Sequence, residues 1–199
     1  MGQRLKLAIA DPPYLGRAST WYGSSIRKSQ LGALHGGTAK INYKPADYHP
    51  EAHLWDDIET HKTLIKQLES DYDGFALCLA HDNLQQLLPL FSVKVKVCIW
   101  HKWTLPSRSC ISNSYEPVII KVPDSRKGAT KGLTTPDVMT YQKREGMGFA
   151  GRKPQAFTFW VLDLLQYQEG DQVDDLFNGS GAVIEALNSY PQKLSTGGK

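Results

Sequence analysis

Short apolar runs alternate with amphipathic segments along the first half of the chain, and this alternation is the feature that most limits the possible folds. Residues 5–10, 74–80 and 94–100 have the character of buried strands. Residues 56–72 and the segment from about residue 82 onward carry apolar side chains at helical spacing. The order strand, helix, strand, helix, strand predicts an α/β fold with a mostly parallel sheet, right-handed crossovers and helices on its faces.

The second half of the chain adds a hairpin and a further strand. Residues 115–122 predict a strand antiparallel to its neighbour, because the short polar link before it suits a hairpin better than a crossover. A helix is expected over residues 154–168, with proline near its first turn. A short strand over residues 172–177 and a helix over residues 182–188 complete the pattern.

Length and composition point to one folded, soluble domain over residues 1–199. Hydrophobic residues make up 41% and charged residues 22%, which excludes a disordered chain or a coiled coil. No apolar stretch approaches the ~20 residues that cross a bilayer, and the start does not resemble a signal peptide. Cysteines and histidines show no metal-ligand spacing. We expect a cytoplasmic protein with no membrane partner and no metal.

Basic residues gather in two weakly patterned stretches, about 15–55 and 123–152, which we expect to be inserted loops. No acid occurs in residues 12–46, and seven basic residues face three acids in residues 121–152. This segregation suits a nucleic-acid backbone, although ordinary solvated loops have the same composition. The candidate nucleic-acid contacts are Arg17, Trp21, Tyr22, Arg27, Lys28, Arg126, Lys127 and Lys131. For the two aromatic residues, packing in the core is an equal alternative.

The segment Asp11-Pro12-Pro13-Tyr14 ends the first strand and carries candidate chemistry. Consecutive prolines have a fixed φ and no N–H, so the carbonyls of Asp11 and Pro12 are held rigidly outside the ladder. A carboxylate, a carbonyl and an aromatic ring together suit a planar exocyclic amine, whose two N–H bonds they accept while the ring stacks. The alternative is a strand-ending turn with a capping aspartate.

A second loop, Asp175-Leu-Phe-Asn-Gly-Ser-Gly181, leads from a strand into a helix. Its glycines let the backbone approach a ligand and present N–H groups to an anionic group. By itself this signal is weak, because any tight turn in a Rossmann-like unit has the same composition.

Together with Arg152-Lys153-Pro154 before the intervening helix, these two segments resemble the amino-methyltransferases of DNA, which methylate N6 of adenine or N4 of cytosine from S-adenosylmethionine. The catalytic motif precedes the glycine loop, as in the permuted class called beta. Trp100-His-Lys102 and Tyr115-Glu116 are similar to the family's strand and hairpin after the catalytic half. The resemblance implies a shortened, Rossmann-like methyltransferase sheet, mostly parallel with an antiparallel hairpin.

The resemblance also implies roles for individual residues. Asp11 and the Pro12 carbonyl would bind the target amine, Pro13 would shape the turn, and Tyr14 would stack on a flipped base. The implied cofactor-binding residues are Asp11, Lys153, Pro154, Asp175, Phe177, Asn178, Gly179, Ser180 and Gly181. The amine nitrogen would attack the sulfonium methyl directly, and acceptors on its hydrogens would stabilise the developing positive charge.

The sequence departs from the family after the glycine loop. Only 18 residues follow Gly181, so we expect two strands of the cofactor half to be missing, and Glu185 is a poor substitute for the acid that binds the ribose. The glycine-loop strand would then lie at an exposed sheet edge. A homodimer that covers this edge, a minimal enzyme with weak cofactor affinity, and a fold kept for binding alone remain open.

The expected function is therefore that of an orphan DNA methyltransferase, adenine-N6 specific, from a phage or mobile element, acting on DNA in a bacterial or phage-infected cell. The alternatives are a cytosine-N4 methyltransferase and a catalytically inactive protein that binds nucleic acid or a partner on the same fold.

Overall fold

The computed structural model describes six segments of the chain: residues 3–22, 50–102, 110–128, 134–141, 152–179 and 181–190. Its strands are β1 (Lys6–Ala10), β2 (Gly74–Cys78), β3 (Lys96–His101), β4 (Tyr115–Lys121), β5 (Val138–Thr140) and β6 (Gln172–Asp175). Its α-helices are α1 (Ala18–Tyr22), α3 (Ile58–Asp71), α4 (Leu84–Leu87), α5 (Gln155–Leu164) and α6 (Ala182–Ser189). Short 3-10 helices are η1 (Ala52–Asp56), η2 (His81–Asn83), η3 (Leu88–Leu90) and η4 (Asp124–Arg126).

The six strands form one sheet in the order β5-β3-β4-β2-β1-β6. Strand β1 pairs in parallel with β2 and with β6, and β3 pairs in parallel with β5. Of the strands in the described segments, β4 alone is antiparallel to every neighbour, which are β2 and β3. The expected α/β class, with a mostly parallel sheet and one antiparallel strand, is confirmed.

Strand β4 lies between β2 and β3 in the sheet. It is antiparallel to β3, as the short polar link before it predicted, and it is also antiparallel to β2, which the sequence had not indicated. Val118, Ile119 and Ile120 are all buried, so both faces of this strand need cover, and a central position provides it. In β3, by contrast, burial alternates, which suits a strand nearer the edge. A further strand that we did not predict, β5, lies within the expected loop 123–152.

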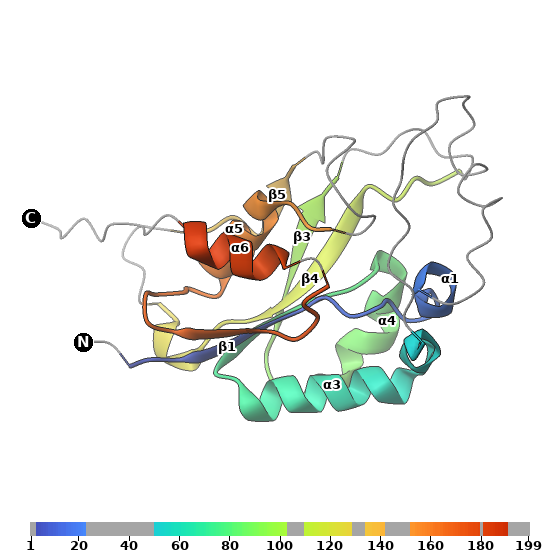
Figure 1. The fold of residues 1–199 in the computed structure, drawn as a ribbon, viewed down its shortest axis with the longest axis horizontal. Helices are drawn as coiled ribbons and strands as arrows, with labels where there is room; N and C mark the ends of the chain where they lie inside the picture. Colours follow the sequence, from blue (N-terminus) through green and yellow to red (C-terminus); the bar gives the residue numbers. More distant parts are fainter. Residues whose placement is uncertain are drawn as a thin grey trace, which may run out of the picture.

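Helices cover both faces of the sheet (Figure 1). Helices α5 and α6 lie on one face, where Phe157 and Val161 pack with Leu7 and Ile9 of β1. Helices α3 and α4 lie on the other face and bury a second apolar cluster that includes Leu68. Within the described segments, no helix is both long and apolar enough to cross a membrane.

Arg126, which we expected among the nucleic-acid contacts, is instead part of the folded interior. Its guanidinium forms a two-pronged ion pair with Asp171, and the side chains of the two residues are 7% and 2% exposed. Asp171 also accepts hydrogen bonds from the backbone N–H groups of Leu5 (3.0 Å) and Gln168 (2.8 Å). The arginine therefore joins η4 to the starts of β1 and β6, and its charge is used inside the fold rather than on a binding surface.

Candidate functional site

The two segments singled out in the sequence lie side by side at one end of the sheet. Strands β1 and β6 are parallel neighbours, with Ile9 opposite Asp175, and the Leu176 N–H donates to the Ile9 carbonyl at 3.1 Å. Asp11 and the glycine loop therefore both start where these strands end, at the carboxyl ends where open α/β sheets bind ligands.

The glycine loop has the open backbone that the sequence indicated. Gly181 adopts a left-handed conformation with φ of +69°, which favours glycine, and a side chain at Gly179 would meet no atom within 4 Å. The Asp175 carboxylate accepts a hydrogen bond from the Phe177 N–H at 3.2 Å, and the Phe177 ring packs edge-on against Trp55, with 4.9 Å between the ring centroids.

Asp175 and Asp11 also influence one another electrostatically. Burial raises the pKa of Asp175, the hydrogen bond from Phe177 opposes that shift, and the negative charge of Asp11 raises the pKa further. Asp175 therefore lies within the electrostatic influence of Asp11, which agrees with the positions of both residues at the ends of adjacent strands.

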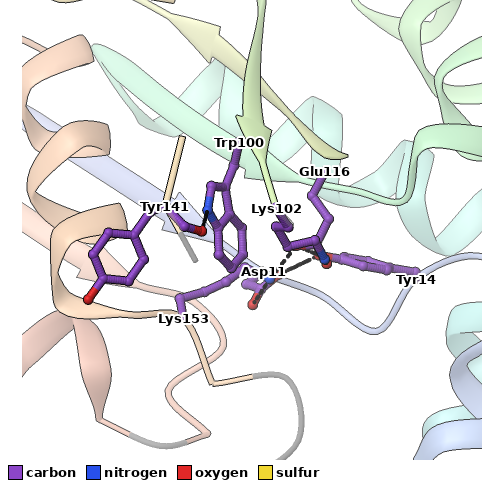
Figure 2. Close-up of polar contacts among 7 residues, drawn as sticks. All are labelled: Asp11, Tyr14, Trp100, Lys102, Glu116, Tyr141 and Lys153. Atoms are coloured by element: carbon purple, nitrogen blue, oxygen red, sulfur yellow. Dashed lines mark hydrogen bonds and ion pairs between the residues drawn. The ribbon is translucent and has the colours of Figure 1, made fainter. Parts of the chain in front are cut away.

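The centre of the site is an ion cluster, which we call the Lys153 cluster and which consists of Asp11, Tyr14, Lys102, Glu116 and Lys153 (Figure 2). The Lys153 ammonium lies 3.0 Å from each oxygen of Asp11, 3.0 Å from the Tyr14 hydroxyl and 3.1 Å from Glu116 Oε2. The Tyr14 hydroxyl also lies 3.3 Å from Asp11 Oδ1 and 3.2 Å from Glu116 Oε2. Lys102 pairs with the other oxygen of Glu116.

Strand geometry explains why these groups meet. Leu7 and Ile9 face α5, so alternation along the chain brings Asp11 to the same face. Trp100 also faces α5, and it lies opposite Glu116 in the β3–β4 ladder. Lys153 comes from the other layer, since it precedes Pro154, the residue that caps the start of α5.

The cluster keeps its charges because each buried group has an opposite partner. Burial acts to lower the pKa of Lys153, but Asp11 and Glu116 together raise it well above the usual range of a lysine. Burial acts to raise the pKa of Glu116, yet Lys153 and Lys102 lower it to about 2. For Tyr14, burial and the two carboxylates raise the pKa of the phenol well above its usual value, so this residue remains a neutral hydroxyl.

Aromatic rings surround the Lys153 ammonium. It lies 5.5 Å from the ring centroid of Tyr14, 5.8 Å from that of Trp100 and 5.9 Å from that of Phe157. The Trp100 indole is fixed in turn by a hydrogen bond to the Tyr141 carbonyl, at 3.3 Å (Figure 2). The cationic end of Lys153 is thus held between carboxylates and ring faces, an arrangement that stabilises a desolvated ammonium.

The other predicted site residues have varied positions. Arg17 pairs with Asp82 at 2.5 Å, and Lys127 is exposed and pairs with Asp124. The Tyr22 side chain is partly buried, and burial, followed by the charge of Asp11, raises the pKa of its phenol. Trp21 lies on α1, and the structure describes its backbone only. Arg27, Lys28, Lys131 and Ser180 lie outside the described residues.

Sequence reasoning did not assign a role in the site to Lys102 or Glu116. The available signal was a charged residue next to an otherwise apolar run in each of two strands predicted to form a hairpin. The observed register places Trp100 opposite Glu116, so Lys102, two residues further on, is a diagonal neighbour of Glu116 and pairs with it. Only this register, together with the approach of Lys153, shows that the pair adjoins Asp11. Among the described residues, no group of three or more histidine, cysteine or acidic side chains could hold a metal ion.

Comparisons with known proteins give a likeness of fold. No protein-family model matches the sequence, and no curated protein matches it. Among solved structures, the chain is similar to one described as the crystal structure of the M1.HpyAVI-SAM complex, with a TM-score of 0.52 and 14% sequence identity. The match covers 94% of this chain and 79% of that one. The protein therefore shares the Rossmann-like α/β fold of that structure.

Proposed function

We propose that this protein is an S-adenosylmethionine-dependent methyltransferase that modifies the exocyclic amine of adenine, N6, in DNA. The observation that carries this proposal is the position of Asp11-Pro12-Pro13-Tyr14 beside the glycine loop, at the ends of two adjacent parallel strands. The similar fold of a structure described as a SAM complex supports it. Methylation of cytosine N4 would use the same acceptor geometry and is the alternative substrate.

The residues present fit this cofactor. Asp11 and Asp175 place two carboxylates at the ends of adjacent parallel strands, and Gly179 leaves room for close approach to the backbone. The residues that would hold the cofactor are Asp11, Lys153, Pro154, Asp175, Phe177, Asn178, Gly179, Ser180 and Gly181. When bound, the cofactor supplies an electrophilic methyl group on a sulfonium.

The chain's own contribution is to position the amine and stabilise its charge. The Asp11 carboxylate and the Pro12 carbonyl accept hydrogen bonds from the amine, so positive charge that develops on the nitrogen meets fixed acceptors. The Tyr14 ring stacks on the base, and holding the two reactants together lowers the barrier further. A base in stacked DNA cannot reach such a corner, so it is flipped out or presented single-stranded.

A methylation assay tests this proposal. Wild-type protein is incubated with S-adenosylmethionine and unmethylated DNA, the DNA is digested, and modified nucleosides are identified by mass spectrometry. We expect N6-methyladenine from the wild type, and at least ~100-fold less from Asp11→Ala, which removes an acceptor used in the transition state. The matched control, Asp57→Ala, removes an exposed cap of α3 and should leave product formation unchanged.

Three outcomes would contradict the proposal. N4-methylcytosine as the only product would show that the target base is cytosine, although the reaction would still be methyl transfer to an exocyclic amine. If Asp11→Ala formed as much product as the wild type, Asp11 would have no catalytic role. No product, together with no calorimetric binding of S-adenosylmethionine with or without DNA, would exclude the methyltransferase and favour a catalytically inactive protein that binds nucleic acid or a partner.

A further inference from the structure

We propose that Glu116 is a positioning residue, which holds the Lys153 ammonium and through it fixes Asp11 and Tyr14 for reaction. This inference rests on the proposed function and adds to it a residue from outside the Asp-Pro-Pro-Tyr motif.

The contacts of Lys153 carry the first step. An ammonium has three N–H donors, and within the described segments three groups offer acceptors to this one: the Asp11 carboxylate, the Tyr14 hydroxyl at 3.0 Å and Glu116 Oε2 at 3.1 Å. The donors are therefore shared between two residues of the loop after β1, Asp11 and Tyr14, and one residue of β4, Glu116. If Glu116 gave no acceptor, the freed donor would turn to the nearest remaining carboxylate, that of Asp11.

This sharing affects the acceptor that the target amine needs. Both oxygens of Asp11 lie 3.0 Å from the Lys153 nitrogen, so the lysine is a direct competitor for the hydrogen-bonding capacity of this carboxylate. Glu116 draws the ammonium toward itself and limits this competition. Its second contact, 3.2 Å from the Tyr14 hydroxyl, holds the outer end of the ring expected to stack on the base.

Glu116 itself is firmly placed. It lies on β4, where it is paired with Trp100 of β3, and its side chain is 19% exposed. Its other oxygen, Oε1, forms an ion pair with the ammonium of Lys102, the residue after β3. Groups held on paired strands position a site more accurately than groups on loops, so Glu116 fixes the position of the Lys153 ammonium.

The proposal can be tested by NMR, because the pKa of Lys153 depends on the negative charge of Glu116. Among the described residues, the titratable groups that act on Lys153 are Asp11, Glu116, Tyr14 and Cys78, and the first two supply the opposing negative charge. Burial favours the neutral amine, and the two carboxylates overcome it. Removing the charge of Glu116 leaves Asp11 as the main counterion, so the pKa of Lys153 should fall.

The first experiment is a pH titration by NMR of protein labelled with ¹³C-lysine, in which Lys153→Met identifies the Lys153 ε-carbon signal. In the wild type, this signal should not move through the range in which an ordinary lysine titrates. In Glu116→Gln it should titrate at least about one pH unit lower than in the wild type, whereas Glu59→Gln, which breaks an exposed pair with Lys62, should leave it in place. An unchanged Lys153 signal in Glu116→Gln would overturn the proposal.

The second experiment is a double-mutant cycle on methyl transfer. We expect Glu116→Gln to lower kcat about 10- to 100-fold, the effect of losing a charge-assisted hydrogen bond, while KM for S-adenosylmethionine changes less than about threefold. The alkaline limb of its pH profile should move toward neutrality. In a Lys153→Met background, the same substitution should have little further effect; a full effect there would overturn the proposal, because Glu116 would then act without Lys153.

Two further measurements separate a failure of this inference from misfolding of the variant and from a failure of the proposed function. If Glu116→Gln does not fold, Glu116→Asp retains the charge and should restore most of the wild-type Lys153 titration; failure to do so in a folded variant would count against the proposal. If the wild type transfers no methyl group, the proposed function fails, and the Lys153 titration still decides whether Glu116 holds this lysine.

Discussion

The ion pair between Arg126 and Asp171 gives the sharpest prediction about stability. Substituting Asp171 by alanine removes both oxygens of a nearly fully buried pair and leaves the arginine with carbonyl acceptors, chiefly that of Gln166 at 2.7 Å. Removing one partner of a buried pair costs about 3–5 kcal/mol. For a domain of this size, ~3 °C per kcal/mol predicts a fall in Tm of about 9–15 °C.

The assay is thermal and urea unfolding followed by circular dichroism. The control is Asp124→Asn, which breaks the exposed pair with Lys127 in the same 3-10 helix and should not change Tm measurably. Replacing both buried partners, as Arg126→Met with Asp171→Leu, should recover part of the loss, because no unpaired charge remains. Equal Tm values for Asp171→Ala and the control would refute the reasoning.

Three further predictions concern pH and packing. Burial acts to raise the pKa of Glu116, but Lys153 and Lys102 outweigh it and lower this pKa from 4.5 to about 2. The contribution of Glu116 to stability should therefore be present above about pH 4.5 and lost toward pH 2. The unfolding free energies of the wild type and of Glu116→Gln should converge as the pH falls, and a constant difference between them would contradict this. Burial lowers the pKa of His61, so stability should fall as pH drops below about 6.5, and His61→Leu should flatten this slope in urea titrations. A methyl group on Gly74 would lie 2.7 Å from the Pro123 ring and 2.9 Å from the Lys121 carbonyl. Gly74→Ala should therefore lower the free energy of unfolding by about 1–3 kcal/mol in the same assay. A stability equal to that of the wild type would show that the start of β2 can move to accept the methyl group.

Local patterns in the sequence were sufficient to predict most of the elements. The helix over residues 56–72 and the strand over residues 5–10 follow from periodicity and from the prolines that end the strand, and the structure confirms both. The place of β4 in the sheet was not predicted in this way, because strand order depends on packing between segments that are far apart in the chain. Four successive residues of β4, 117–120, are buried, which agrees with its position between β2 and β3.

In the site, too, the residues of local motifs could be predicted, whereas residues that act through distant contacts could not. Asp11, Tyr14 and the glycine loop could be found because each forms a local motif with its own chemistry. Lys102 and Glu116 could not, since their role depends on the register of two strands and on the approach of Lys153 from another layer. Arg126 was assigned to a binding surface because its neighbours are basic, whereas its burial depends on a partner 45 residues away, which no local pattern reveals.

The central claim is that the Asp-Pro-Pro-Tyr corner and the glycine loop form one binding site. The most direct measurement is a titration of ¹⁵N-labelled protein with S-adenosylmethionine, followed by the backbone amide signals of Asp11 and Tyr14 and of Gly179 and Gly181. We predict that both groups of signals shift together and give one common Kd, while the amides of α3 stay unchanged. Shifts confined to one of the two segments, or different Kd values for the two, would contradict the account.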